Sequence, residues 1–600
     1  MEPSRGRRTL VEIGLSVLTG VISVVAAVIA LRISPADLTK RWAVPSDDAV
    51  LHYMLFKSAT QSFTFADNSA LGFPNGLNAF FTQQVDASSA VIMSIMALVI
   101  HNGLLLLNLF WLLTFVSAGI TAYFFFRALR IRPGFAILFG TIFSIAPYHF
   151  IKVLYGHAFI GNYWAIPLIG ILVLVAAGSE ADPFRSWGDA AATSRSRILR
   201  RTMPPVVLGF LVASTGAYFF VFGVIVVGGV WAFTVIRTLV LGKRLRTLLG
   251  ATSAIVPLGF FVVVELLLLA GGYGERTAVY FTRSPAESES FAGKLVPLLA
   301  PWTGSGVPFA GRIETTYDTA SMILQGTGPV GTPIVASVGL ILLTVASVVF
   351  AVAGRGDLSA TWFGRIVDDP RTRALAPAMG WTFLFYIVSG LGVVVALVAG
   401  PQIRAWSRIS IVLMLIGLAF TALLIQGATT RFGVRKILIG LVILTAVFDQ
   451  VVGVHTIVHI RPTSDTAVQE FVSAVDKALP NRCGVVQLPL KGFPESGPLG
   501  DLKDYDEAIP YLYTKGDDLR WSYGAVTGTK GDEFGHVTTP QNFAADVSST
   551  GACAVEVDLA GYSADPKGWQ AMVKAATGTT LPSLTSSDKR YLLFPVPGKS

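Results

Sequence analysis

Apolar runs long enough to cross a membrane recur along the first 456 residues, and shorter polar stretches separate them. A helix of about 20 apolar residues crosses the hydrocarbon layer of a bilayer, and by this length the pattern predicts about eleven spans. They lie near residues 10–32, 104–126, 134–150, 161–178, 203–218, 219–240, 248–270, 331–353, 379–399, 409–426 and 436–456. The pattern therefore predicts a multi-pass α-helical membrane protein.

Residues 87–101 are apolar but too short to be an obvious span, and a polar His-Asn-Gly step separates them from the run at 104–126. If both segments crossed the membrane, three arginines that follow would lie outside: Arg127, Arg130 and Arg132. Basic residues in short loops normally mark the cytoplasmic side. We therefore predict a re-entrant or interfacial helix at 87–101.

The same rule orients the whole chain. Three arginines precede the first span, which predicts a cytoplasmic N-terminus. Two long polar segments then fall outside as external loops, at 33–86 and 271–330. The predicted domains are a transmembrane domain at 1–456 and an extracytoplasmic domain at 457–600.

The C-terminal segment reads as a small α/β domain. Strand-like stretches near 483–490, 519–523, 553–559 and 591–596 alternate with helical stretches near 465–479, 538–548 and 566–576. Cys483 and Cys553 each begin an expected strand. Because disulfides persist outside the cytoplasm, these two cysteines are candidates for a disulfide.

Composition supports the membrane assignment and narrows the functional classes. Hydrophobic residues make up 52% of the 600 residues and charged residues only 14%, whereas soluble domains carry about 25% charged residues. The net charge of +9 is concentrated in loops predicted to be cytoplasmic, so it gives no reason to expect nucleic acid as a partner. Two cysteines are too few for a four-cysteine zinc site.

Two adjacent carboxylates just outside the first span are the leading candidates for chemistry. Asp47 and Asp48 open an expected helix at 47–62, and His52 follows on the same helical face. In an ordinary structural role the carboxylates would cap that helix. In a catalytic role, two close carboxylates tend to separate their pKa values, so that one can act as a base.

Other polar residues stand out by position. His149, Lys152 and His157 crowd a turn between two spans, Arg404 and Arg408 lie in a short external loop, Asn75 lies in an amide-rich loop, and Glu265 lies within a span. The i, i+4 spacing predicts that both arginines share one helical face, where guanidinium groups suit a phosphate. Interfacial anchoring is the ordinary alternative for the loop residues, and an acid within a span requires a partner or water.

The order of these motifs resembles the GT-C superfamily of membrane glycosyltransferases. The matching segments are DDAVLHY at 47–53, LGFPNG at 71–76, PYHF at 147–150 with Gly156-His157, IRAWSRIS at 403–410, and LRWSYG at 519–524. They are spread over most of the chain. Their order is more specific than any one of them.

The resemblance implies a transferase in a bacterial plasma membrane that moves a sugar, with inversion, from a polyprenyl-phosphate donor to an envelope glycan, lipid or protein. It implies that Asp47 or Asp48 is the general base, and that Arg404, Arg408 and Lys152 hold the donor phosphate. The remaining candidates for substrate binding are His52, Asn75, His149, His157 and Glu265.

Two alternatives stay open: a transporter or flippase of lipid-linked saccharides, and a non-catalytic envelope assembly protein. Transporters often carry internal repeats and midplane sites, and this sequence shows no obvious repeat. The cofactor also stays open, with a divalent cation as one candidate.

Overall fold

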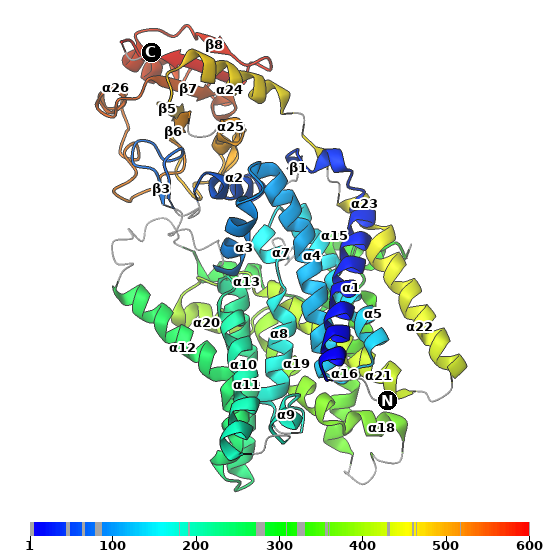
Figure 1. Ribbon diagram of the computed structural model, residues 1–600. Helices are drawn as coiled ribbons and strands as arrows, with labels where there is room; N and C mark the ends of the chain where they lie inside the picture. The colour runs from blue at the N-terminus through cyan, green and yellow to red at the C-terminus, as the bar shows by residue number, and fades with distance from the viewer. Residues whose placement is uncertain are drawn as a thin grey trace.

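The computed structural model describes residues 5–43, 48–62, 67–78, 87–178, 180–189, 193–271, 283–307, 309–320, 330–353, 358, 361–428, 432–458, 461–463, 465–515 and 518–598. A bundle of long helices forms the N-terminal part, and a smaller domain with a β-sheet lies at one end of the bundle (Figure 1). This architecture confirms the predicted fold class, a multi-pass helical membrane protein with a C-terminal α/β domain.

Among the residues that the structure describes, 8 helical segments are long and apolar enough to cross a membrane. They are Gly6–Leu31 in α1 (Arg5–Leu31), Gly103–Ala128 (α4), Pro133–Leu154 (α5 Pro133–Ser144 with α6 Pro147–Leu154), Ala217–Val240 (α11), Leu249–Leu267 in α12 (Leu249–Gly271), Ile334–Val352 (α16), Trp406–Gly427 in α21 (Ser410–Ala428) and Gly433–Ile457 in α22 (Phe432–Val447) and α23 (Val454–Ile457). Each coincides with a predicted span.

The three other predicted spans fall on helices that do not meet this criterion. α8 (Ala165–Ala176) has 12 residues and is buried along its whole length, because other helices surround it. α10 (Ser194–Ala213) is basic in its first half. The predicted span at 379–399 is interrupted between α19 (Pro370–Tyr386) and α20 (Leu391–Ala399). At this break, the Val388 N–H donates to the Gly293 carbonyl at 2.9 Å.

The segment at 87–101 forms a short helix of its own, α3 (Ala87–Ala97), followed by a break before α4. The side chain of Asn102 caps α4 by accepting the Leu105 N–H at 2.9 Å. At about 1.5 Å per residue, the 11 residues of α3 are too short to cross a bilayer. Its re-entrant or interfacial position stays a prediction.

The C-terminal domain is built on a five-stranded sheet of order β6-β5-β7-β9-β8. The strands are β5 (Cys483–Leu488), β6 (Leu519–Trp521), β7 (Ala554–Asp558), β8 (Leu584–Thr585) and β9 (Tyr591–Pro595), and the helices include α24 (Thr466–Ala478), α25 (Ile509–Tyr513), α26 (Pro540–Ser549) and α27 (Gln570–Thr577). β6, β5 and β7 are parallel, and β9 and β8 are antiparallel. A disulfide joins Cys483 and Cys553 at the start of the central strands, as the sequence suggested.

The first external loop covers the β6 edge of this sheet. The N–H groups of Gly72 and Phe73 donate to the carbonyls of Tyr523 and Trp521 at 2.9 and 3.0 Å, and the Trp521 N–H donates to Ala70. The Phe73 ring fills the space above Gly484, where an added Cβ would lie 2.3 Å from the ring. Two motifs that lie more than 400 residues apart therefore pair through their backbones, and they fix the C-terminal domain over the first external loop.

Candidate functional site

α2 (Asp48–Gln61) carries the candidate carboxylate Asp48 in its first turn. Its residues Ala49–Ala59 are buried, packed against α4 on one side and α25 on the other. At the far end, the buried Lys57 donates to the carbonyls of Tyr511 and Thr514 in the C-terminal domain. α2 therefore packs between the membrane part and the C-terminal domain, with Asp48 at its N-terminal end.

Asp48 accepts a hydrogen bond from His157 Nε2 at 2.6 Å. A close backbone approach brings the two together, since a Cβ at Gly156 would lie 2.6 Å from that of Ala49. Burial favours a higher pKa for Asp48, but the hydrogen bond from His157 and nearby positive charges outweigh it and lower the pKa. Burial lowers the pKa of His157 to about 4. At neutral pH, an ionised Asp48 therefore faces a neutral histidine, and about a third of the Asp48 side chain is open to solvent.

His52 supports this arrangement from within α2. Its Nδ1 lies 2.6 Å from the backbone carbonyl of Asp48, and its ring packs against Phe159 with centroids 4.8 Å apart. The side chain is buried, and burial lowers its pKa. A neutral, buried His52 therefore fixes the backbone at Asp48, and its predicted role in substrate binding stays a prediction.

Two cations lie at the ends of neighbouring spans, beside this pair. Lys152 lies on α6 with its Nζ 4.7 Å from the ring centre of Tyr148, and the Arg408 guanidinium lies 4.5 Å from the ring centre of Tyr218. Arg408 is close enough to Asp48 to influence its charge state. Within the described parts of the chain, neither cation has a carboxylate within 4.0 Å. Their described neighbours are therefore aromatic rings rather than carboxylates.

Arg404 has a different environment from Arg408, and the prediction that both share one helical face is wrong. The helix begins only at Trp406, as a 3₁₀ turn at Trp406–Ile409, so Arg404 lies before it. The buried Trp406 ring packs on Gly392, where a Cβ would lie 2.5 Å away, and this contact fixes the start of the helix. Arg404 pairs with Glu287 of α13 (Pro285–Ser290) at 2.6 Å.

The C-terminal domain adds a carboxylate to the same region. Glu495, in the loop after β5, lies 4.0 Å from Arg283 and within electrostatic reach of Arg404 and Asp48. Burial raises the pKa of Glu495, with Asp48 acting in the same direction and the two arginines opposing. The site therefore lies between the span ends and the outer domain.

Three predicted site residues lie elsewhere. His149 is a core histidine, which bonds Thr114 at 2.8 Å and stacks on Phe115. The Asn75 amide donates to the Gly531 carbonyl at 3.3 Å and lines a polar pocket of about 530 Å³. Gln61, at the C-terminal end of α2, also lines this pocket. Since a helix rises about 1.5 Å per residue, the pocket lies about 20 Å from Asp48 at the other end of α2. Glu265 is exposed on the surface of α12.

Asp47 lies outside the described residues, so the structure does not compare it with Asp48. The described residues contain no group of three His, Cys, Asp or Glu side chains that could hold a metal ion. The divalent cation stays an untested prediction.

Sequence reasoning missed Tyr218 and Glu495. Tyr218 begins a long apolar helix, where a tyrosine is an ordinary interfacial anchor. Glu495 lies in a Gly-Phe-Pro-Glu-Ser turn with no chemical pattern around it. No local signal distinguishes either residue, because each reaches the site only through the tertiary fold.

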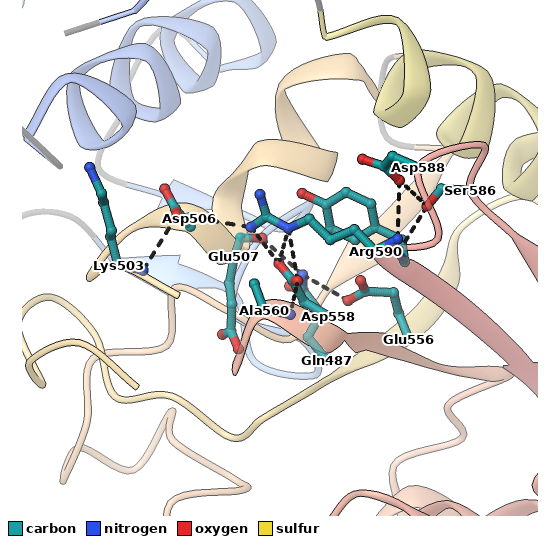
Figure 2. Close-up of polar contacts among 11 residues, drawn as sticks. Gln487, Lys503, Asp506, Glu507, Glu556, Asp558, Ala560, Ser586, Asp588 and Arg590 are labelled. Carbon is teal, nitrogen blue, oxygen red and sulfur yellow. Dashed lines mark hydrogen bonds and ion pairs between the residues drawn. The ribbon is translucent and has the colours of Figure 1, made fainter. Parts of the chain in front are cut away.

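A second group of carboxyls lies inside the C-terminal domain (Figure 2). Asp558 is buried and paired with Arg590 at 2.6 Å. Gln487 donates to the Glu556 carboxyl at 3.4 Å and to the Glu507 backbone carbonyl at 2.8 Å. Burial, and then the neighbouring carboxyl groups, raise the pKa values of Glu507 and Glu556 well above their ordinary range. Burial therefore favours the protonated form of both acids.

These two acids should make the domain less stable in alkali. Because their pKa values are higher in the folded than in the unfolded state, their contribution is full below the unfolded pKa and is lost as the pH rises through the folded pKa. We expect the unfolding temperature of the detergent-solubilised protein to fall as the pH rises above the ordinary range of a carboxyl group. Glu507→Gln and Glu556→Gln should make the unfolding temperature depend less on pH. Glu470→Gln, at an exposed position, should leave this dependence unchanged. An equally steep fall in all variants would contradict the assignment.

No protein-family model matches the chain, and no curated protein matches it. The arabinofuranosyltransferase AftD from Mycobacteria aligns over 97% of this chain and 40% of its own, with 12% identity and a TM-score of 0.50. The oligosaccharyltransferase of Archaeoglobus fulgidus in the apo form aligns over 94% of this chain and 71% of its own, with 12% identity and a TM-score of 0.45. ArnT from Cupriavidus metallidurans, bound to undecaprenyl phosphate, aligns over 100% and 99%, with 13% identity and a TM-score of 0.39.

The likeness to AftD is one of fold, and it agrees with the multi-pass helical fold that the sequence predicted. This chain spans 40% of the length of AftD.

Proposed function

We propose that this chain, which has the fold of the GT-C superfamily of membrane glycosyltransferases, transfers a sugar from a polyprenyl-phosphate donor to a hydroxyl group at the outer membrane surface. The observation that supports this most strongly is the position of an ionised carboxylate, Asp48, beside two cations that have no carboxylate within 4.0 Å among the described residues. A transferase of this kind needs a base next to a phosphate site, at the depth where a lipid carrier presents its headgroup.

Lys152 and Arg408 are the proposed phosphate ligands. Both lie at the end of a membrane span, so a lipid chain bound there can extend along the helices into the bilayer. Ammonium and guanidinium groups form strong charge-assisted hydrogen bonds with phosphate oxygens. The rings of Tyr148 and Tyr218 hold the two cations in place. Arg404 is less suited to this role, because Glu287 already neutralises it.

Asp48 is the proposed general base. Its carboxylate takes the proton of the acceptor hydroxyl as the hydroxyl oxygen bonds to the anomeric carbon of the donor. The bond from that carbon to the phosphate oxygen breaks, and its electron pair leaves with the phosphate. Lys152 and Arg408 stabilise the charge that develops there. A single displacement of this kind inverts the anomeric configuration.

His157 lowers the pKa of Asp48 through its hydrogen bond, so removing His157 should change the pH dependence of kcat/KM. His157→Leu removes the hydrogen bond that opposes the effect of burial, so the pKa of Asp48 should rise. Since the base works only when ionised, the acidic fall of kcat/KM should move to higher pH. His536→Gln, at an exposed position, provides the matched control. An acidic limb that stays in place in His157→Leu would argue against Asp48 as the titrating base.

A proteoliposome experiment separates transfer from lipid flipping. Purified protein is reconstituted with polyprenyl-phosphoryl pentoses and hexoses, and the products are separated by thin-layer chromatography. We expect free polyprenyl phosphate and a new glycoside when an acceptor is present. Movement of intact donor between leaflets, without any release of polyprenyl phosphate, would reject the transferase in favour of a flippase.

A further inference from the structure

The loop after β5 holds Glu495 firmly over the site. Phe493 is buried, and its N–H donates to Thr527 Oγ1 at 2.8 Å. On the other side of Glu495, the Ser496 N–H donates to the Asp504 carboxylate at 3.2 Å. With both flanks fixed, the Glu495 side chain extends from the C-terminal domain towards the membrane part.

Charges in the site differ with depth. Lys152 and Arg408 belong to the ends of membrane spans and have no carboxylate within salt-bridge distance among the described residues. The cations farther out each have a carboxylate close by: Glu287 lies 2.6 Å from Arg404 and Glu495 lies 4.0 Å from Arg283. Among the described residues, carboxylates therefore line the outer layer, whereas the cations of the inner layer face aromatic rings.

The two layers correspond to the two substrates. A lipid-linked donor must enter from the membrane and occupy the inner layer. The acceptor then approaches Asp48 from the outer layer, where it meets Glu495 and Glu287. Carboxylates accept hydrogen bonds from hydroxyl groups, and they repel a second anion.

We infer that Glu495 is a specificity-determining residue contributed by the C-terminal domain, and that it selects an uncharged, polyhydroxylated acceptor, a saccharide, over an anionic one. This inference rests on the proposed transferase function. It gives the C-terminal domain a direct part in acceptor selection, beyond covering the site.

Matched acceptor probes test the inference. The purified full chain receives a polyprenyl-phosphoryl sugar that it consumes, together with octyl glucoside or other neutral octyl glycosides, or with octyl glucuronide, which differs from the glucoside by its carboxylate. We expect kcat/KM for a neutral glycoside to exceed that for the glucuronide about tenfold or more, since like charges placed together disfavour binding. Glu495→Gln should narrow this ratio, mainly by lowering KM for the glucuronide.

Two further variants keep the result interpretable. Arg283→Gln removes the positive charge that partly offsets the negative charge of Glu495. It should therefore increase the ratio of kcat/KM for the neutral glycoside to kcat/KM for the glucuronide. A general loss of structure would not increase this ratio. Glu470→Gln, at an exposed position on α24, should leave the ratio unchanged.

Equal use of glucoside and glucuronide by the unmodified protein would overturn the inference. An unchanged ratio in Glu495→Gln would overturn it as well. A third result would also overturn the inference: the protein hydrolyses the donor, but no neutral glycoside in the panel accepts the sugar or reduces the rate of hydrolysis. If no polyprenyl-phosphoryl donor is consumed under any condition, the proposed function itself has failed, and the two failures are thereby distinguished.

Discussion

Replacing Asp48 with asparagine should lower the rate of sugar transfer about a thousandfold, since general bases contribute roughly 10²–10⁴ to enzymatic rates. Asparagine keeps the size and the first-turn position of the side chain but cannot accept the proton. The donor should still bind, because Lys152 and Arg408 are unchanged. The measurement is the initial rate of glycoside formation at saturating donor, together with KM for the donor.

Two other aspartates make this result specific. Asp67→Asn, at an exposed position in the same external loop, should retain full activity. Asp47→Asn tests the alternative that the sequence left open. If Asp47→Asn abolished transfer while Asp48→Asn remained active, the base would be Asp47 and the assignment made from the His157 contact would be wrong.

Removing the two cations at the span ends should have the second-largest effect. A hydrogen bond to a charged group contributes about 1.5–3 kcal/mol, so Lys152→Met and Arg408→Gln should each lower kcat/KM for the donor about 10- to 100-fold. The loss should also appear in binding of undecaprenyl phosphate alone, measured by native mass spectrometry. That readout does not require turnover, so it separates donor binding from the chemical step.

Arg404→Gln is the matched comparison for these variants. Because Glu287 pairs with Arg404, this substitution should weaken undecaprenyl phosphate binding much less than Arg408→Gln does. A larger loss with Arg404→Gln than with Arg408→Gln would move the phosphate site outward and contradict the separation into an inner and an outer layer.

Hydropathy located the long spans, and alternating strand-like and helical stretches indicated the C-terminal α/β fold, because both depend on local sequence. The sequence pattern also placed Asp48 at the start of a helix in the loop that follows the first span. The pairing of Asp48 with His157 was not predictable, since the two are joined by a backbone contact between Ala49 and Gly156, more than 100 residues apart. Spacing indicates which residues share a turn, but not which helix lies against it.

The positions that the sequence did not indicate have the same cause. His149 and Lys152 lie on one short helix, yet His149 points into the core and Lys152 lies at the site. The i, i+4 spacing of Arg404 and Arg408 suggested a shared face, but the helix begins between them. Glu495 comes from a separate domain that docks through backbone pairing with the first external loop. Each of these positions depends on packing that a single sequence does not display.

The most direct test of the central claim is the release of polyprenyl phosphate from a labelled polyprenyl-phosphoryl sugar, measured side by side for the unmodified protein and Asp48→Asn. We expect the unmodified protein to release polyprenyl phosphate and transfer the sugar to a hydroxyl acceptor, and the variant to lose about a thousandfold in rate although undecaprenyl phosphate still binds. Equal release by both proteins, or none by the unmodified protein with any donor sugar, would contradict it.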